Sequence, residues 1–250
     1  MSGHSKWATI KHKKGALDAK RGRLFTKLIK ELTVAARMGG GDPGGNPRLR
    51  TAIADAKAQS MPNDTIQRAV KRGTGELEGA ALEEVLYEGT GPSGTLFLVE
   101  GMTDNRNRTV AEIRKIFEKN GGVLGGASTA GWAFDKKGLV IVPKANATED
   151  QLMETAVGAG ADDYSAEGDD WHIVSSPDAL NGVVDALEKA NIAKTKSQLA
   201  YLPKTKKPIV GKDAETALNL ADALDEHDDV QNVYADFDIS DDEMAKLAEE

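Results

Sequence analysis

The sequence has 250 residues, 40% of them hydrophobic and none of them cysteine, which suits one to two ordinary domains or three small ones. The absence of cysteine excludes disulfides, thiolate zinc sites and cysteine nucleophiles, and no apolar run approaches the ~18 residues that a membrane span needs. The first seven residues lack the apolar stretch of a secretory signal, so we expect a cytoplasmic protein with no membrane partner.

The formal net charge of −8 is an average over two unlike parts of the chain. Residues 1–72 contain 16 Lys and Arg against 5 Asp and Glu, whereas residues 73–250 contain 16 against 35. Such a basic N-terminal part favours a polyanionic partner, that is, nucleic acid. The alternative is that the basic part packs against the acidic remainder of its own chain.

Residues 1–14 are polar and basic, and they hold too few apolar side chains to offset the entropy lost on ordering. We expect this tail to be mobile when the protein is alone. Trp7 either stacks on an exposed base or packs on the helical domain that follows. The candidate nucleic-acid contacts in the tail are Lys6, Trp7, Lys11, Lys13 and Lys14.

From Ala16 to Met38 the spacing of apolar residues predicts a helix with one buried stripe. The stripe consists of Phe25, Leu28, Ile29, Leu32 and Ala36. Cations recur at the same spacing on the other side, which predicts one exposed basic face. They are Lys20, Arg23, Lys27 and Lys30.

Two further helices complete a small bundle. Asn46-Pro47 predicts the start of the first, and the second follows a short break at 60–63 and stops at Gly73. Any compact bundle contains such a helix pair, so a helix-turn-helix that reads bases and a pair that contacts only phosphates both stay open. Further cations are predicted on these helices at Arg48, Arg50, Arg68, Lys71 and Arg72.

After Gly75 the pattern becomes mixed α/β. Residues 136–203 follow the order β-α-β-β-α-β, which predicts a ferredoxin-like domain. The last strand, 230–237, needs neighbours that the incomplete sheet before residue 135 offers. We therefore predict an α+β multidomain fold, with an N-terminal three-helix bundle and then two α/β domains, the ferredoxin-like one inserted in the other. The predicted domains are residues 1–75, residues 76–135 plus 204–250, and the inserted 136–203.

The segment Asp104–Thr109 lies between a strand end and a helix start, where backbone N–H groups and arginines can hold an anion. A site at Asn105, Arg106 and Arg108 is one interpretation, and it gains if the glycine pairs between Gly121 and Gly126 approach the same place. The alternative is an ordinary helix cap whose arginines pair with the acidic body.

Catalytic and metal-binding patterns are not visible in the sequence. The stretch Gly121–Gly131 matches neither a Rossmann nor a Walker loop, and its glycines are expected to serve turns. The four histidines show no metal or triad spacing, and the acid pairs, Asp228-Asp229 among them, are expected to be solvated. We expect no enzyme, no cofactor, no metal and no small-molecule substrate.

Several motifs resemble the YebC family over essentially the whole chain. The most specific are the opening Gly3-His-Ser-Lys-Trp7 and the segment Thr103-Asp-Asn-Arg-Asn-Arg-Thr109. Others are Asn46-Pro-Arg-Leu-Arg50, Lys71-Arg-Gly-Thr-Gly75 and Asp229-Val-Gln-Asn-Val-Tyr234. The sequence departs from the family pattern at 126–131, where the family often has an acid followed by glycine and serine.

The resemblance implies a helical bundle followed by two α/β domains, and a regulator of gene expression. The family is usually described as DNA-binding transcriptional regulators. A second branch, which includes the mitochondrial translational activator of cytochrome oxidase, acts on ribosomes. We therefore expect DNA binding and transcription regulation, with RNA or ribosome binding and translation regulation as the alternative. A protein-interaction module that never meets nucleic acid is the rival class.

Overall fold

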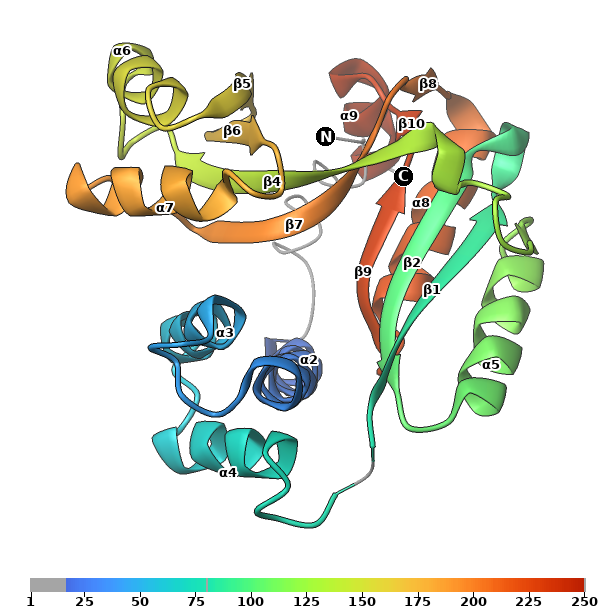
Figure 1. Cartoon of the computed structure of the whole chain (residues 1–250). Coiled ribbons are helices and arrows are strands. Elements are labelled where there is room, and N and C mark those ends of the chain that lie inside the picture. The colour runs from blue at the N-terminus through green and yellow to red at the C-terminus, as the bar shows by residue number, and fades with distance from the viewer. Residues whose placement is uncertain (1–16, 80, 250) are drawn as a thin grey trace. The chain divides into compact units, whose positions relative to one another are not determined.

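The computed structural model describes residues 17–79 and 81–249 (Figure 1). The chain divides into two compact units, one formed by Phe134–Lys204 and the other by the described residues before and after it. Both units contain helices and strands, and the larger unit begins with a segment that is helical only. The predicted α+β class is therefore confirmed. In the described part of the chain, no helix combines the length and the apolar character that crossing a bilayer requires.

Three helices form the predicted N-terminal bundle. They are α2 (Leu17–Gly39), α3 (Pro47–Ala58) and α4 (Asn63–Gly73). Leu32 and Leu49 are fully buried in its core, Leu32 as the apolar stripe of the first helix predicts. The Thr33 hydroxyl donates to the Ala69 carbonyl at 3.3 Å, which links α2 to α4. A Cβ on Gly73 would lie 2.3 Å from the Thr33 carbonyl oxygen, so only glycine permits this close approach.

Asn46 joins two of these helices through its buried side chain. Its Oδ1 accepts from the Leu49 backbone N–H at 3.1 Å, which caps α3 as predicted. Its Nδ2 donates to the carbonyls of Ala35 and Gly40, so the same side chain also ties the end of α2. The turn between α2 and α3, which contains the glycine-rich segment Gly39–Gly45, is therefore held at both ends.

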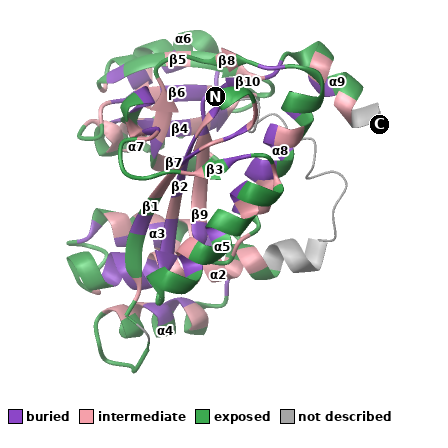
Figure 2. Cartoon of the chain, turned by 90° about the vertical axis from the view of Figure 1, so that its right-hand side faces the viewer, coloured by how far each residue is buried: buried purple, intermediate pink, exposed green. Residues whose placement is uncertain are grey.

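A four-stranded antiparallel sheet follows the bundle in the larger unit, with the strand order β3-β1-β2-β9. The strands are β1 (Glu83–Thr90), β2 (Leu96–Thr103), β3 (Val123–Leu124) and β9 (Val230–Ala235). Two helices supply its core with apolar residues, namely α5 (Arg106–Lys119) and α8 (Gly211–Asp225). In Figure 2, β2 is largely buried, whereas α5 presents exposed residues toward the viewer. The strand β9 joins this sheet after the long insertion, as predicted.

Short elements complete the same unit. They are the 3₁₀ turns η1 (Pro92–Gly94) and η2 (Gly131–Ala133), the parallel pair β8 (Lys207–Pro208) and β10 (Phe237–Asp238), and the helix α9 (Asp241–Glu249). Phe237 lies at the centre of the core, 5.9 Å from Phe97 between ring centroids. The predicted closing strand 230–237 is therefore divided into β9 and β10.

The inserted unit has the predicted ferredoxin-like order. Its elements are β4 (Phe134–Pro143), α6 (Glu149–Leu152), the π-helical turn η3 (Met153–Val157), β5 (Ala161–Glu167), β6 (Asp170–Ser175), α7 (Leu180–Lys189) and β7 (Lys196–Pro203). The strand order is β5-β6-β4-β7. Val140, Val142 and Ile173 face a core that Leu152 and Leu187 complete from the helices. The entering strand β4 pairs directly with the leaving strand β7, from Phe134 opposite Pro203 onward.

Candidate nucleic-acid interface

The cations of α2 do not form a free basic face. Arg23, Lys27 and Lys30 lie at spacings of four and three, so they share one side of the helix. Carboxylates at the C-terminal end of α8 occupy this side: Lys27 lies 2.8 Å from an oxygen of Asp225, and Arg23 lies 3.8 Å from one of Glu226. The predicted exposed face is therefore wrong for these three residues, because the chain's own acids neutralise them.

Lys30 is the most firmly held of these cations. Its ammonium donates to the Asp229 carboxylate at 2.6 Å, to the Asp228 carbonyl at 2.9 Å and to the Met102 carbonyl at 3.2 Å. Three acceptors satisfy the three N–H groups of the ammonium. Only 15% of the Lys30 side chain is exposed, so this contact is removed from solvent.

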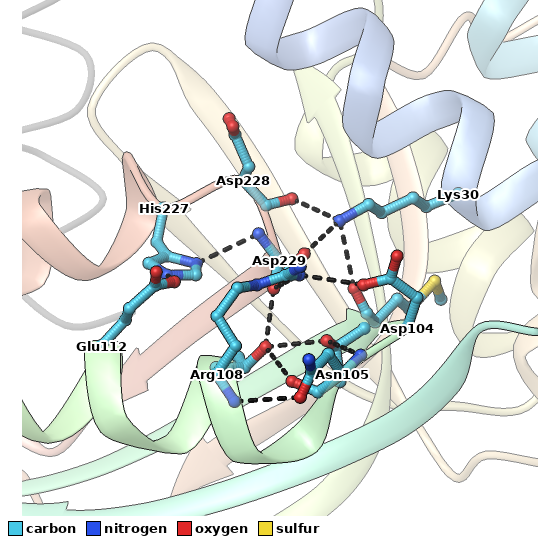
Figure 3. A network of polar contacts seen from close by, with 11 residues as sticks. Lys30, Asp104, Asn105, Arg108, Glu112, His227, Asp228 and Asp229 are labelled. Carbon is cyan, nitrogen blue, oxygen red and sulfur yellow. Dashed lines mark hydrogen bonds and ion pairs between the residues drawn. The ribbon is translucent and has the colours of Figure 1, made fainter. Parts of the chain in front are cut away.

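Asp229 is the centre of a polar network (Figure 3). One carboxylate oxygen accepts from Lys30, and the other accepts from Arg108 at 2.8 Å and from the Thr109 hydroxyl at 2.6 Å. We call these four residues the Asp229 network. Burial opposes ionisation of Asp229, but the hydrogen bonds from Lys30, Thr109 and Arg108 outweigh it and hold the pKa of this carboxyl well below its ordinary value. The prediction that Asp228-Asp229 is a solvated pair is wrong for Asp229, which is 5% exposed.

The backbone of β2 positions Asp229. The Asp229 carbonyl accepts from the Met102 N–H at 2.8 Å, at the point where the pairing of β2 with β9 shifts register. A Cβ on Gly101 would lie 2.7 Å from the Asp229 carbonyl oxygen. The close approach of the two chains therefore requires glycine at position 101. The Asp229 side chain lies beside the first turn of α5, where it contacts Arg108 and Thr109.

The start of α5 is a capped helix end, and the anion beside it is the carboxylate of Asp229. Asn105 Oδ1 accepts from the Arg108 N–H at 3.1 Å, which makes Asn105 the N-cap. Arg108 pairs with Asp104 at 2.9 Å as well as with Asp229, and Arg106 lies 3.8 Å from an oxygen of Glu83. The structure therefore favours the capped helix over an open anion site at Asn105, Arg106 and Arg108.

The glycine pairs between Gly121 and Gly126 do not contribute to a site at the start of α5. Gly121 and Gly122 follow the other end of α5, which is 14 residues long. Their loop is fixed instead by Glu88, whose carboxylate accepts from the backbone N–H groups of Ser128, Ala130 and Gly131 at 3.1, 2.6 and 2.7 Å. Burial raises the pKa of Glu88, but these N–H groups outweigh it and lower the pKa below its ordinary value.

His227 extends the Asp229 network toward α5. Its Nδ1 accepts from the Asp229 N–H at 3.1 Å, which leaves the ring proton on Nε2, 2.9 Å from a carboxylate oxygen of Glu112. Ligand atoms of Glu112, His227 and Asp229 lie within 4.8 Å of one another. The oxygens of Asp229 and the Nδ1 of His227 are engaged by protein donors, so the geometry is that of a hydrogen-bonded network.

Arg48 is also paired. Its guanidinium donates to both oxygens of Glu31, at 2.6 and 3.0 Å, and to Glu84 at 2.7 Å. The hydrogen bond with Glu31 is the largest cause of a raised pKa at Arg48. The prediction that Arg48 is available to phosphates is therefore wrong: it links α2 and β1 to α3.

Four predicted cations remain exposed and free of carboxylates within the described part of the chain. They are Arg50, Arg68, Lys71 and Arg72. Arg50 donates to the Pro43 carbonyl at 3.3 Å, and Arg68 donates from Nε to the Asp64 carbonyl at 3.2 Å. Lys71 and Arg72 lie in the last turn of α4. Three of these four cations, Arg68, Lys71 and Arg72, therefore lie on α4.

The remaining predicted contacts fall outside the described residues. They are Lys6, Trp7, Lys11, Lys13 and Lys14. Lys20 lies in α2, but its side chain is not among those described. Nucleic-acid contact through these residues and through α4 stays a prediction, as does the helix-turn-helix.

The acids that meet α2 are not predicted by the sequence. Asp225, Glu226 and Asp229 lie roughly 200 positions beyond their partners, and no local pattern joins them. The only signal was the charge asymmetry, which left a basic part packed on an acidic body as an alternative. The structure favours that alternative for α2 but not for α4.

Comparison with known families identifies the chain. Residues 5–76 match the model described as the TACO1/YebC protein N-terminal domain, and residues 82–237 match that of the TACO1/YebC second and third domain. The chain belongs to the TACO1/YebC family. The resemblance seen in the sequence motifs is therefore confirmed.

Relatives and a solved structure agree with this family. A protein of Geobacter sulfurreducens is 56% identical over 247 residues, covering 99% of this chain and 100% of the relative. One from Desulfotalea psychrophila is 54% identical over 250 residues, covering both chains completely. Both are named "Probable transcriptional regulatory protein". The crystal structure of a conserved hypothetical protein from Aquifex aeolicus, 44% identical, matches with a TM-score of 0.87 over 94% of this chain and 98% of that one.

Proposed function

We propose that this member of the TACO1/YebC family is a nucleic-acid-binding regulator of gene expression that acts by binding and not by catalysis. DNA is the first candidate target, with transcription as the regulated step. The observation that carries the proposal is the group of exposed cations on α4, Arg68, Lys71 and Arg72, which have no carboxylate partner in the described part of the chain. Relatives that carry the name "Probable transcriptional regulatory protein" support the regulatory role.

Phosphate neutralisation by α4 explains why these charges are left unpaired. Cations that replace condensed counterions of nucleic acid gain affinity from the released ions, whereas cations already paired with carboxylates gain little. The chain pairs Arg23, Lys27 and Lys30 of α2 with its own carboxylates and leaves Arg68, Lys71 and Arg72 of α4 exposed. The acidic remainder of the chain repels phosphates, so it directs a polyanion toward the bundle.

The proposal is tested by binding of the full chain to mixed-sequence duplex DNA at several salt concentrations. The variant Arg68→Ala/Lys71→Ala/Arg72→Ala removes the α4 charges. We expect weaker binding and a decrease of about 2–3 in the slope of log affinity against log salt. The matched control is Arg114→Ala/Lys115→Ala/Lys119→Ala on α5, which removes three exposed cations from another helix that also carries a basic last turn.

Equal losses in the two triple variants would contradict a role for α4 and leave only a general effect of net charge. No binding of the wild type to DNA would contradict the DNA proposal. The same surface would then be tested on ribosomes, the target in the alternative of a translational activator, by co-sedimentation with the same two variants. Failure with both polymers would leave a protein-interaction module.

A further inference from the structure

A hollow lies between α2 and α4 on the side that carries the free arginines. It is lined by Ile29, Thr65, Arg68, Ala69 and Arg72. The α4 residues follow a spacing of three and four, so they lie along one side of that helix. We call this feature the α4 hollow. It lies wholly within the helical bundle.

The lining of the α4 hollow combines an apolar floor with cationic walls. Ala69 is 2% exposed, and Ile29 packs against the bundle core from α2. Arg68 and Arg72 are exposed, one turn apart on the rim. A flat, weakly polar ring between two guanidinium groups fits this composition, because guanidinium planes stack on bases and also bind phosphates.

The donors on the rim are available. Arg68 uses Nε for the Asp64 carbonyl, which leaves its terminal nitrogens without a partner among the described residues. For Arg72, the described chain provides neither a hydrogen bond nor a carboxylate within 4 Å. Two other bundle arginines are engaged by the protein: Arg48 by Glu31 and Arg37 by the Leu82 carbonyl. Positive charge without a partner beside an apolar hollow points to a ligand that is both anionic and planar.

We infer that the α4 hollow binds an unpaired nucleotide, with the base against Ile29 and Ala69 and the flanking phosphates on Arg68 and Arg72. This inference rests on the proposed function and specifies its ligand. Bases stacked inside a duplex cannot enter a hollow, whereas unpaired bases are free to do so. Such a nucleotide occurs in melted DNA and in folded RNA, and the two sources share the chemistry that the hollow recognises.

The test compares three oligonucleotides of one sequence: single-stranded DNA, single-stranded RNA and duplex DNA. Each single strand carries one 2-aminopurine, whose emission changes when the base leaves its stacked neighbours. We expect the full-length wild type to bind at least one single strand about tenfold more tightly than the duplex. The strand that binds more tightly identifies the source.

Two matched variants separate filling of the hollow from loss of charge. Thr65→Phe places a ring in the α4 hollow and keeps every charge, so it should abolish the preference for single strands and the emission change. Gln67→Phe adds the same ring at an exposed position of α4 outside the hollow and should preserve both. Circular dichroism of both variants checks that the bundle remains folded.

The outcomes are distinguishable. Equal affinity of the wild type for single strands and duplex, or an unchanged preference in Thr65→Phe, would overturn the inference and leave the proposed function standing. A wild type that binds neither nucleic acid at any salt concentration overturns both. Should Thr65→Phe fail to fold, the variant Arg68→Ala/Arg72→Ala replaces it, and it must lose more affinity for single strands than for duplex.

Discussion

Lys30 and Asp229 are 199 positions apart in the chain and form a 2.6 Å ion pair whose side chains are 15% and 7% exposed. A charged pair so removed from solvent is costly to break, because the partner that remains is left buried and unpaired. The pair also joins α2 of the bundle to the residue that immediately precedes the strand β9 of the sheet. It therefore couples the stability of two parts that the sequence alone would treat as separate.

Replacing Asp229 by asparagine should destabilise this unit by about 2–4 kcal/mol, because the ammonium of Lys30 loses its counter-charge while it stays largely buried. Urea denaturation of the full chain measures the loss. Asp104→Asn is the control, since Asp104 pairs with the same Arg108 but lies at the surface, and its loss should stay within about 1 kcal/mol. Equal effects of the two substitutions would show that the Asp229 network contributes nothing beyond a surface pair.

The stabilisation from Asp229 should depend on pH in a definite direction. The folded state lowers the pKa of this carboxyl, so the contribution is complete above its ordinary pKa of about 4 and is lost as the pH falls below that value toward the lowered one. The difference in unfolding free energy between wild type and Asp229→Asn should therefore be constant from pH 7 to about 5 and shrink in acid. A difference that grows in acid would contradict the hydrogen-bonding assignment.

Removing the paired cations of α2 should affect nucleic-acid binding little. Arg23→Ala/Lys27→Ala leaves Lys30 in place, and we expect a change of less than about twofold in affinity for duplex DNA, because carboxylates already neutralise both residues. Salt titrations beside the α4 triple variant measure this. If both variants weaken binding equally, Arg23 and Lys27 contact phosphate in the complex, and Asp225 and Glu226 must move away from them.

Replacing Glu88 by alanine should release the glycine-rich loop. Three backbone N–H groups lose their shared acceptor, at a cost of about 1–3 kcal/mol in local stability. Hydrogen exchange should rise at Ser128, Ala130 and Gly131 while the protection of β2 stays unchanged. Glu118→Ala, at an exposed position of α5, is the control. Unchanged exchange at these three amides would contradict the role of Glu88.

Local pattern was sufficient for most of the fold. Patterns among residues near one another in the sequence predict these elements. They include the apolar spacing of α2, the Asn46-Pro47 start of α3, and the succession of helix and strand patterns in the ferredoxin-like unit. The strands β3 and β10 have two residues each, too few for any alternation to show. The helix α9 is not predicted from the sequence, because its first turn consists of acids and its few apolar residues form no clear stripe.

The candidate site was predicted less well, and for a physical reason. Helical spacing places Arg23, Lys27 and Lys30 on one side, but it does not say what lies opposite that side. Two of the acids that pair with these cations, Asp225 and Glu226, lie at the end of α8, beyond the inserted unit. The length of that insertion does not indicate which residues contact each other. Asp228-Asp229 resembles the other acid pairs in the sequence, and the burial of Asp229 follows from partners that are distant in the chain, Lys30 and Arg108.

The position of β9 has a consequence for how the chain matures on the ribosome. Asn232 donates to Glu100 across a separation of 132 residues, so β2 emerges long before its outer neighbour has been synthesised. The inserted unit is contiguous and can complete its own sheet in the meantime. Until translation reaches β9, the hydrogen-bonding edge of β2 remains unsatisfied and open to wrong partners, which makes this edge the vulnerable point of a nascent chain.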